Sequence, residues 1–195
     1  MKENKYDDNI FFQKYSQMSR SQQGLAGAGE WETLRKLLPD FKDKRVLDLG
    51  CGYGWHCIYA MEHGASSVVG VDISHKMLEV AKEKTHFPQV EYKCCAIEDV
   101  EFPEESFDVI LSSLAFHYVA DYEILVKKIY RILMSGGKLV FRVEHPVFTA
   151  YGTQDWHYNE KGEILHFPVD NYYYEGKRTA VYLGDKVTNF HRTLT

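Results

Sequence analysis

Residues 45–54, R-V-L-D-L-G-C-G-Y-G, form the stretch that decides the fold. The first half, 46–49, is a mainly apolar run that is too short for a helix and suits a strand buried on both faces. Glycines then stand at alternate positions, where missing Cβ atoms let the backbone turn sharply and approach a ligand. After Gly54, apolar residues recur with helical spacing until Gly64, where a helix should end. Strand, glycine turn and helix N-terminus together predict a nucleotide-binding unit, because free amides and the helix dipole favour a polar or anionic group there.

The spacing of the glycines indicates which kind of nucleotide binds. A dinucleotide-binding loop, G-x-G-x-x-G, would place its third glycine at position 55, which is occupied by Trp55. The observed pattern is D-x-G-x-G-x-G, and its Asp48 suits a cationic amine better than a pyrophosphate. A second apolar strand over 67–73 carries Asp72 at its tip, where a carboxylate can accept both hydroxyls of a ribose. A ligand with a ribose, an amine and no pyrophosphate indicates S-adenosylmethionine.

Three motifs resemble those of the class I S-adenosylmethionine-dependent methyltransferases: D-L-G-C-G-Y-G at 48–54, V-D-I-S at 71–74 and S-S-L-A-F-H-Y at 112–118. The resemblance covers 45–145 and is greatest to the small-molecule branch, typified by ubiquinone- and menaquinone-biosynthesis enzymes and by bacterial methyltransferase-domain proteins. It implies a Rossmann-like fold, S-adenosyl-L-methionine as the cofactor and S-adenosyl-L-homocysteine as its product. It does not identify the acceptor, although 112–115 is unlike the N-P-P-Y-type tetrad of nucleic-acid amino-methyltransferases.

The order of the expected elements predicts a doubly wound α/β fold. Strands are expected at 45–49, 67–73, 90–96, 107–114 and 137–143, with helices between them, which requires a mainly parallel sheet with helices on both faces. Ser74 and Asp121 are the expected N-caps of two helices, the second of which should carry Ile124 on its apolar side and end at Gly136. The family's C-terminal antiparallel strand pair is not evident before Thr195, so we expect a truncated chain or a homodimer that covers the sheet edge.

The chain divides into three expected parts: a helical segment at 1–44, the S-adenosylmethionine-binding core at 45–146 and an aromatic-rich, partly β substrate-side region at 147–195. The stretch 6–23 fits either a helix outside the sheet or a flap over the cofactor with Tyr6 and Tyr15 facing it. The stretch 30–38 predicts a helix whose apolar face includes Leu37. The aromatic run 148–178 fits either a substrate-pocket wall or a β-rich excursion, and 172–189 alternates like a strand pair.

The cofactor should lie at the carboxyl ends of the strands. Near the adenine, Ile97 can offer an apolar surface and its backbone amide, and Glu98 or Asp99 can accept from the exocyclic amine. In the family an aspartate usually follows the third strand, but Ala96 stands there, so we expect backbone contacts in place of a side-chain contact from that position. Met77 fits either the cofactor site or the core. The residues expected to bind the cofactor are Tyr15, Asp48, Gly50, Cys51, Gly52, Gly54, Trp55, Asp72, Ile73, Met77, Ala96, Ile97, Glu98, Ser112, Leu114 and His117.

Methyl transfer from a sulfonium is an in-line displacement in which alignment alone can supply ~7–11 kcal/mol of the barrier, so a catalytic side chain is optional. If a proton must leave the acceptor, the base should lie at the tips of the fourth and fifth strands. The candidates there are His117, Glu144 and His145. The alternative for His117 is a structural histidine that holds its loop. The residues expected to contact the substrate are Tyr118, Tyr151 and Trp156.

Composition argues against several other classes of function. The chain has 195 residues, a formal net charge of −5 and no dense run of lysine or arginine, unlike nucleic-acid-binding or membrane-binding surfaces. The polar N-terminus is unlike a signal peptide, so we expect a cytoplasmic protein. The resemblance to the small-molecule branch implies a small-molecule acceptor. Its four cysteines show no ligand spacing, and we expect no metal and solvated histidines at His56, His63, His75 and His86. A non-catalytic S-adenosylmethionine binder and an NAD-dependent oxidoreductase are the alternatives.

Overall fold

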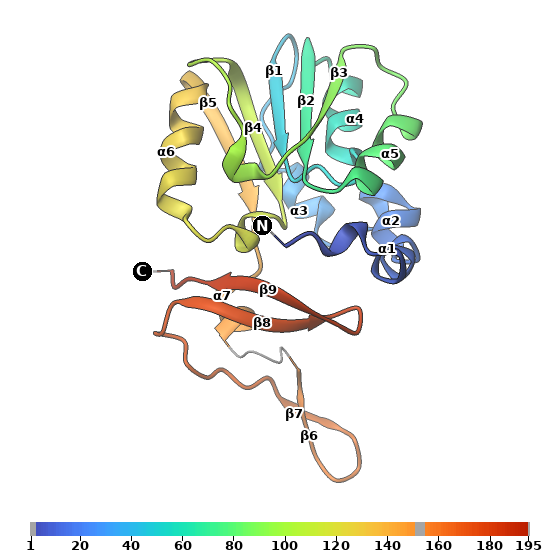
Figure 1. Ribbon diagram of the computed structural model, residues 1–195, viewed down its shortest axis with the longest axis vertical. Coiled ribbons are helices and arrows are strands. Elements are labelled where there is room, and N and C mark those ends of the chain that lie inside the picture. The colour runs from blue at the N-terminus through green and yellow to red at the C-terminus, as the bar shows by residue number, and fades with distance from the viewer. Residues whose placement is uncertain (1–2, 151–154, 195) are drawn as a thin grey trace.

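A five-stranded parallel sheet forms the centre of the computed structural model, which describes residues 3–150 and 155–194 (Figure 1). The strand order is β3-β2-β1-β4-β5, and every neighbouring pair is parallel. The strands are β1 (Arg45–Leu49), β2 (Ser67–Asp72), β3 (Val90–Cys94), β4 (Phe107–Ser113) and β5 (Leu133–Arg142). This arrangement confirms the predicted doubly wound α/β fold. The chain order reverses between β1 and β4, the place where such sheets bind ligands.

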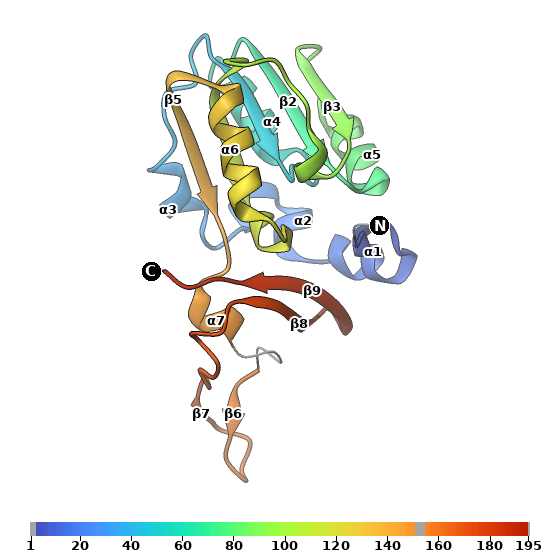
Figure 2. The same cartoon turned by 60° about the vertical axis from the view of Figure 1, so that its left-hand side comes forward.

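Helices cover both faces of the sheet, because successive side chains of a strand point to opposite faces (Figure 2). On one face α6 (Tyr122–Ile132) packs over Leu47 and Leu49. On the other face α4 (Trp55–Glu62) and α5 (His75–Lys84) pack over Val46 and its neighbours. Val46, Leu47 and Leu49 have no exposed surface, which confirms the prediction of a strand buried on both faces.

Local signals set most of the helix boundaries. Ser74 Oγ accepts the N–H of Met77 at 3.2 Å where α5 begins, and Asp121 Oδ1 accepts the N–H of Ile124 at 3.0 Å where α6 begins, as predicted. Gly64, with a φ of +88°, follows the end of α4. The predicted end of α6 at Gly136 is wrong, because the chain leaves the helix after Ile132 and enters β5 directly.

Two apolar side chains predicted for the core are exposed instead. Leu37 is 66% exposed, because α3 (Trp31–Arg35) ends before it. Ile124 is 58% exposed, because the buried stripe of α6 runs through Leu125, Ile129 and Ile132 and leaves Ile124 beside it. The sequence therefore predicted the end of α3 too late and assigned one residue too many to the buried face of α6.

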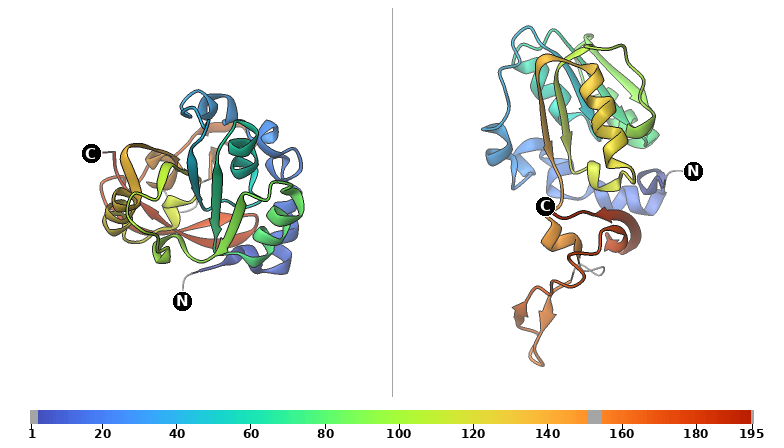
Figure 3. Two further views of the ribbon diagram at one scale, coloured as in Figure 1. Left: turned by 90° about the horizontal axis from the view of Figure 1, so that it is seen from above. Right: turned by 90° about the vertical axis from the view of Figure 1, so that its left-hand side faces the viewer.

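The chain after β5 forms two antiparallel hairpins. The short helix α7 (Pro146–Ala150) precedes β6 (His157–Tyr158) and β7 (Ile164–His166), which project away from the sheet (Figure 3). The second hairpin, β8 (Gly176–Tyr182) and β9 (Asp185–His191), lies below the carboxyl ends of the parallel strands (Figure 1). The sequence predicts this strand pair, but with β8 beginning too early. The turn lies at Leu183 and Gly184, whose φ values of +53° and +82° suit a tight hairpin turn.

The N-terminal segment lies beside this hairpin. It comprises η1 (Lys5–Asp7), α1 (Asn9–Ser16), α2 (Ser19–Gln22) and η2 (Gly24–Gly27). Lys14 Nζ donates to the carbonyl of Leu183 at 2.8 Å, and the rings of Phe11 and Tyr182 meet edge to face at 5.8 Å. Two segments from opposite ends of the chain therefore lie together at the carboxyl ends of the parallel strands. Across residues 3–150 and 155–194, no helix has the length and apolar character needed to span a membrane.

Candidate active site

A cavity of about 900 Å³ opens at the carboxyl ends of the parallel strands. One side is formed by the loops that follow β1, β2, β3 and β4, and the other by the N-terminal segment, the end of β5 and the β8–β9 hairpin. The cavity is within the size range of small-molecule sites. The cavity therefore lies between the loops of the parallel sheet and the two terminal parts of the chain, the N-terminal segment and the β8–β9 hairpin.

The glycine loop borders this cavity through Gly50 and Gly52. Its backbone is anchored to β2: the N–H groups of Gly50 and Cys51 donate to the carbonyl of Val71, at 2.8 and 2.9 Å, and Gly52 N–H donates to Asp72 Oδ2 at 2.9 Å. A Cβ atom at Gly50 would lie 2.4 Å from Ala115 Cβ, whereas one at Gly52 would meet no atom within 4 Å. The loop is therefore close-packed on one side and open to a ligand on the other.

Other residues predicted around this loop do not border the cavity. The side chains of Cys51 and Trp55 pack away from it, and Gly54 contacts Tyr92, whose hydroxyl would lie 2.2 Å from an added Cβ atom. Ser112 is buried, and its Oγ donates to the carbonyl of Leu49 at 2.8 Å. These positions build the loop rather than its ligand-facing surface.

Asp48 is buried behind the glycine loop and does not border the cavity. Cys57 Sγ donates to Asp48 Oδ2 at 3.6 Å, and Oδ1 has no partner among the described residues. Burial, together with the nearby charge of Asp72, raises the pKa of Asp48 to about 7. The predicted direct contact between this carboxylate and an amine of the ligand therefore has no path in this geometry.

His56, predicted to be solvated, is instead packed against Asp48 and the ring of Trp31. Its Nδ1 lies 3.9 Å from Asp48 Oδ2, and burial lowers the pKa of His56 to about 4. The imidazole is neutral at physiological pH, so this contact is not an ion pair. The prediction failed because the buried side of α4 includes this position as well as Cys57 and Ala60.

The tip of β2 presents Asp72 and Ile73 to the cavity, and Met77 on α5 lies beside them. Asp72 accepts the N–H of Gly52 through Oδ2 and that of Ser74 through Oδ1, each at 2.9 Å. Burial raises the pKa of this carboxyl, and the two backbone donors oppose that effect. Asp72 thus remains a well-ordered acceptor at the edge where a ribose is expected.

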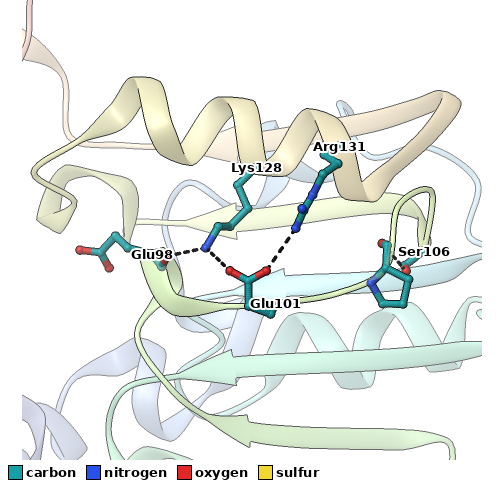
Figure 4. Close-up of polar contacts among 6 residues, drawn as sticks. Glu98, Glu101, Ser106, Lys128 and Arg131 are labelled. Atoms are coloured by element: carbon teal, nitrogen blue, oxygen red, sulfur yellow. Dashed lines mark hydrogen bonds and ion pairs between the residues drawn. The ribbon is translucent and has the colours of Figure 1, made fainter.

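The loop after β3 contributes Ala96, Ile97 and Glu98 to the cavity, in and before η3 (Ile97–Asp99). Its position is held from α6, as Figure 4 shows: Lys128 Nζ donates to the carbonyl of Glu98 at 2.7 Å and to Glu101 Oε1 at 3.0 Å. Arg131 donates to the other oxygen of Glu101 at 3.2 Å. Helix α6 therefore fixes the wall predicted to face an adenine.

The N-terminal segment brings two tyrosines to the cavity, Tyr6 and Tyr15, the two side chains that the flap alternative assigns to it. Their rings meet edge to face at 5.3 Å, and the hydroxyls of Tyr6 and Tyr118 lie 3.4 Å apart. Asp7 fastens this segment to α5, because its Oδ1 accepts the hydroxyl proton of Ser74 at 2.6 Å. The flap is thus tied to the same turn that carries Asp72.

The loop after β4 carries Leu114, His117 and Tyr118 along the cavity. Leu114 has a φ of +57°, a strained conformation typical of functional loops. His117, in η4 (Phe116–Tyr118), is 5% exposed, and its Nδ1 has no hydrogen-bond partner among the described residues. Burial, with the charges of Arg142 and Arg192, lowers the pKa of His117 to about 4, so the ring is neutral and one of its nitrogens accepts.

Glu144 and His145 follow β5 and also border the cavity. Glu144 Oε2 accepts from Asn189 Nδ2 at 3.4 Å. His145 is exposed, and its Nδ1 accepts the N–H of Val147 at 3.2 Å where α7 begins, which gives this side chain a local capping role. Arg142 and Arg20 border the cavity as well and both pair with Glu30.

The structure does not bring the predicted substrate contact Trp156 to the cavity. Trp156 directly precedes the β6–β7 hairpin, which projects away from the sheet, and its side chain is 47% exposed. Its ring meets that of Phe167 at 5.3 Å between centroids. Tyr151 lies outside the described residues. The cavity wall comes instead from the β8–β9 hairpin, through residues that the sequence analysis missed: Tyr182, Val187, Thr188, Asn189 and Phe190. The strand-like alternation at 172–189 was the available signal for the hairpin, but it does not indicate which side chains border the cavity.

Among residues 3–150 and 155–194, no group of three or more histidine, cysteine, aspartate or glutamate side chains is arranged to hold a metal ion. The four cysteines are free thiols, of which Cys51 and Cys57 are buried and Cys94 is exposed.

Comparison with known proteins shows which family this chain resembles. The profile of the family called Methyltransferase domain matches residues 47–141. A solved structure from Listeria monocytogenes, assigned to the S-adenosylmethionine-dependent methyltransferases, is 55% identical and superposes with a TM-score of 0.82 over 86% of this chain and 79% of that one. A solved S-adenosylmethionine-dependent methyltransferase from Mesorhizobium loti is 40% identical, with a TM-score of 0.81 over 88% of this chain and 78% of that one.

A curated relative agrees over the core. The ubiquinone biosynthesis O-methyltransferase of Coxiella burnetii is 35% identical over 112 residues, which are 56% of this chain and 47% of that protein. This chain therefore matches about half the length of that relative. The glycine loop, the Asp72 anchor, the strand order and these similarities agree: the chain belongs to the S-adenosylmethionine-dependent methyltransferases.

Proposed function

We propose that this protein transfers the methyl group of S-adenosylmethionine to a small-molecule acceptor inside the cavity. The observation that carries the proposal is the glycine loop, pinned by Asp72 and open to a cavity that is closed on its far side by the flap and the β8–β9 hairpin. A cavity of about 900 Å³ accommodates a nucleoside and a small acceptor rather than a segment of a macromolecule.

The residues at the glycine-loop end fit S-adenosylmethionine. Gly52 leaves open the space that a Cβ atom would occupy, so a ligand can approach the backbone there. The carboxylate oxygens of Asp72 each accept one backbone N–H and retain a lone pair for a ribose hydroxyl. Met77, Ala96 and Ile97 supply an apolar surface for the base. When bound, S-adenosylmethionine supplies an electrophilic methyl group on a sulfonium.

The opposite end of the cavity provides the groups that orient an acceptor. The rings of Tyr6, Tyr15, Tyr118 and Tyr182 line it together with Phe190, and they exclude water and hold a flat or apolar molecule. Such orientation accounts for ~7–11 kcal/mol of catalysis in well-aligned intramolecular reactions. The strongest catalytic contribution expected from this chain is therefore alignment in a dry site.

His117 is the best-placed group to receive a proton from the acceptor. It is neutral, buried and borders the cavity, and its Nδ1 has no partner within the described part of the chain. Its low pKa makes it a weak base, so it serves best for an acceptor that loses its proton as the new bond forms. Glu144 is the second candidate, since its carboxylate lies at the same end. His145 is the least favoured, because it caps α7.

The first test is calorimetric titration of the purified chain with S-adenosylhomocysteine, with NAD as the control ligand. Micromolar binding of the former without binding of the latter is the expected result, and binding of NAD alone would contradict the proposed cofactor. Transfer of label from methyl-tritiated S-adenosylmethionine is then measured into three fractions of a bacterial extract: small molecules, protein and RNA. Label in the small-molecule fraction supports the proposal. Binding without transfer to any fraction would favour a non-catalytic binder.

A further inference from the structure

Asn189 is a buried polar residue on β9 with incomplete hydrogen bonding. It is 3% exposed, lies on the inward face of the hairpin between Val187 and His191, and borders the cavity. Its Nδ2 donates to Glu144 Oε2 at 3.4 Å, while its Oδ1 has no partner among the residues that the structure describes. The opposite amide orientation would turn Oδ1 toward a carboxylate, with two acceptors facing each other. The contact with Glu144 therefore identifies Oδ1 as the available atom.

A buried carbonyl oxygen without a donor is costly, because it has lost its water without gaining a replacement. An apolar side chain of similar volume would avoid this cost, as Val187 does two residues earlier on the same face. Asn189 is thus a poor choice for packing alone. A ligand that brings a hydrogen-bond donor into the cavity would satisfy it.

A second buried polar atom that has no partner among the described residues lies on the element that packs against β9. In the described ranges, two buried polar side-chain atoms without a partner belong to residues that border the cavity, Asn189 Oδ1 and His117 Nδ1. His117 is in η4, which contacts β9, and Arg192 ties the end of β9 to the same loop by donating to the carbonyl of Ala120 at 3.0 Å. The carboxylate of Glu144, which accepts from Asn189 Nδ2, also borders this end of the cavity. Asn189 Oδ1 and the Glu144 carboxylate therefore give this end of the cavity acceptors that suit a ligand carrying a hydrogen-bond donor.

We propose that Asn189 Oδ1 accepts a hydrogen bond from the O–H or N–H group of the acceptor that is methylated, and that Glu144 orients the Asn189 amide. The acceptor's oxygen or nitrogen displaces S-adenosylhomocysteine from the methyl carbon, and its proton, which an amide oxygen cannot take, passes to the neutral ring of His117. This inference rests on the proposed function and narrows it to acceptors methylated on a hydroxyl or an amine. Molecules that react through a carbon atom or a thioether sulfur carry no such donor and do not match the site. Asn189 is thereby a specificity-determining residue that lies outside the segment matched by the family profile.

The experiment compares the native chain with Asn189→Leu, and with Lys186→Leu as a control on the exposed face of the same strand. S-adenosylhomocysteine affinity, melting temperature and tritium transfer into a small-molecule bacterial extract are measured for each. We expect Asn189→Leu to keep the affinity and the melting temperature but to lose transfer by roughly tenfold to a hundredfold, as for a lost buried hydrogen bond. Lys186→Leu should behave as the native chain. Mass spectrometry of the labelled product should show an O-methyl or N-methyl group.

Three outcomes would overturn the inference. Transfer by Asn189→Leu at the native rate would show that the amide binds nothing needed for the reaction. Parallel losses of melting temperature and S-adenosylhomocysteine affinity in Asn189→Leu would assign it a structural role, and a product methylated on carbon or sulfur would contradict the acceptor class. If the native chain binds S-adenosylhomocysteine but labels no small molecule, the proposed function itself fails, which is distinct from a failure confined to Asn189→Leu.

Discussion

The carboxylate of Asp72 accepts the backbone N–H of Gly52 at 2.9 Å, and this bond joins the tip of β2 to the glycine loop that follows β1. The other carboxylate oxygen accepts the N–H of Ser74 at 2.9 Å, at the N-cap of α5. One side chain therefore sets the relative positions of two cavity walls. Its remaining lone pairs face the space where we place the ribose.

Replacing Asp72 by alanine should weaken S-adenosylhomocysteine binding. The change removes hydrogen bonds to a charged group, which are worth about 1.5–3 kcal/mol, and it also frees the glycine loop. Titration calorimetry measures the loss. Asp121→Ala is the matched control, because it removes a carboxylate that caps α6 and does not border the cavity. Equal affinities of Asp72→Ala and the native chain would show that this carboxylate does not hold the ligand.

Alanine substitutions in the glycine loop should separate folding from binding. A Cβ atom at Gly50 would lie 2.4 Å from Ala115 Cβ, so Gly50→Ala should lower the melting temperature markedly. A Cβ atom at Gly52 would meet no protein atom within 4 Å, so Gly52→Ala should lower the free energy of unfolding only by the backbone strain of its φ of +53°, about 1–2 kcal/mol. The added methyl group would occupy space that we assign to the ligand, so S-adenosylhomocysteine binding should weaken more in Gly52→Ala than in Gly50→Ala. Gly29→Ala, at an open position with ordinary φ, is the control. Native affinity in Gly52→Ala would mean that the ligand does not approach this backbone.

Asp7→Ala should release the N-terminal flap. Asp7 accepts the hydroxyl proton of Ser74 at 2.6 Å and the N–H of Lys76 at 3.1 Å, although 67 residues separate Asp7 from Ser74. By analogy with lost helix caps, we expect a loss of about 1–2 kcal/mol in unfolding free energy and faster hydrogen exchange across α1. Urea denaturation and hydrogen-exchange mass spectrometry test this, with Asp40→Ala as the control in an exposed loop. Unchanged exchange in α1 would show that other contacts hold the flap.

Asp48→Asn should stabilise the protein at alkaline pH. Burial raises the pKa of Asp48 to about 7, so the folded state binds this proton more tightly than the unfolded state does. The protonated carboxyl therefore contributes stability that is complete below the unfolded pKa of about 4 and is lost as the pH rises through the folded pKa of about 7. The neutral isostere avoids that loss, so its melting temperature should exceed the native value at pH 8 and converge with it near pH 4. If the two melting temperatures differ by the same amount from pH 4 to pH 8, the pKa of Asp48 is not raised by burial.

His117→Gln should reduce the acid sensitivity of the fold. Burial lowers the pKa of His117 to about 4, below its unfolded value of about 6.5, so the unfolded state takes up the proton first as the pH falls. Stability is therefore lost as the pH falls from about 6.5 to about 4, and the variant should lose less. Melting temperatures across this range provide the measurement, and His86→Gln on an exposed segment is the control. Parallel curves for His117→Gln and the native chain would show that His117 titrates normally.

The sequence by itself determined the elements whose signals are local. The apolar run 46–49, the alternating glycines and the caps at Ser74 and Asp121 depend on neighbouring residues, so strands, turns and helix starts followed from them. The right-handed connection rule then led from the element order to the parallel sheet. Asp72 was found in the same way, because the end of a buried strand is visible in the chain itself.

Only the tertiary structure decided which side chains share the cavity. Asp48 and Asp72 look alike in sequence, yet one lies behind the glycine loop and the other at its open edge, because strand register and loop curvature fix their directions. Asn189 and Tyr6 lie near opposite ends of the chain, and both β9 and Tyr6 contact the loop after β4 in its middle. Local periodicity carries no signal for such long-range contacts. Trp156 shows the converse: this aromatic residue of the expected region is exposed and outside the cavity lining, beside a hairpin that projects from the sheet. Long-range packing, which depends on all the elements at once, set these positions.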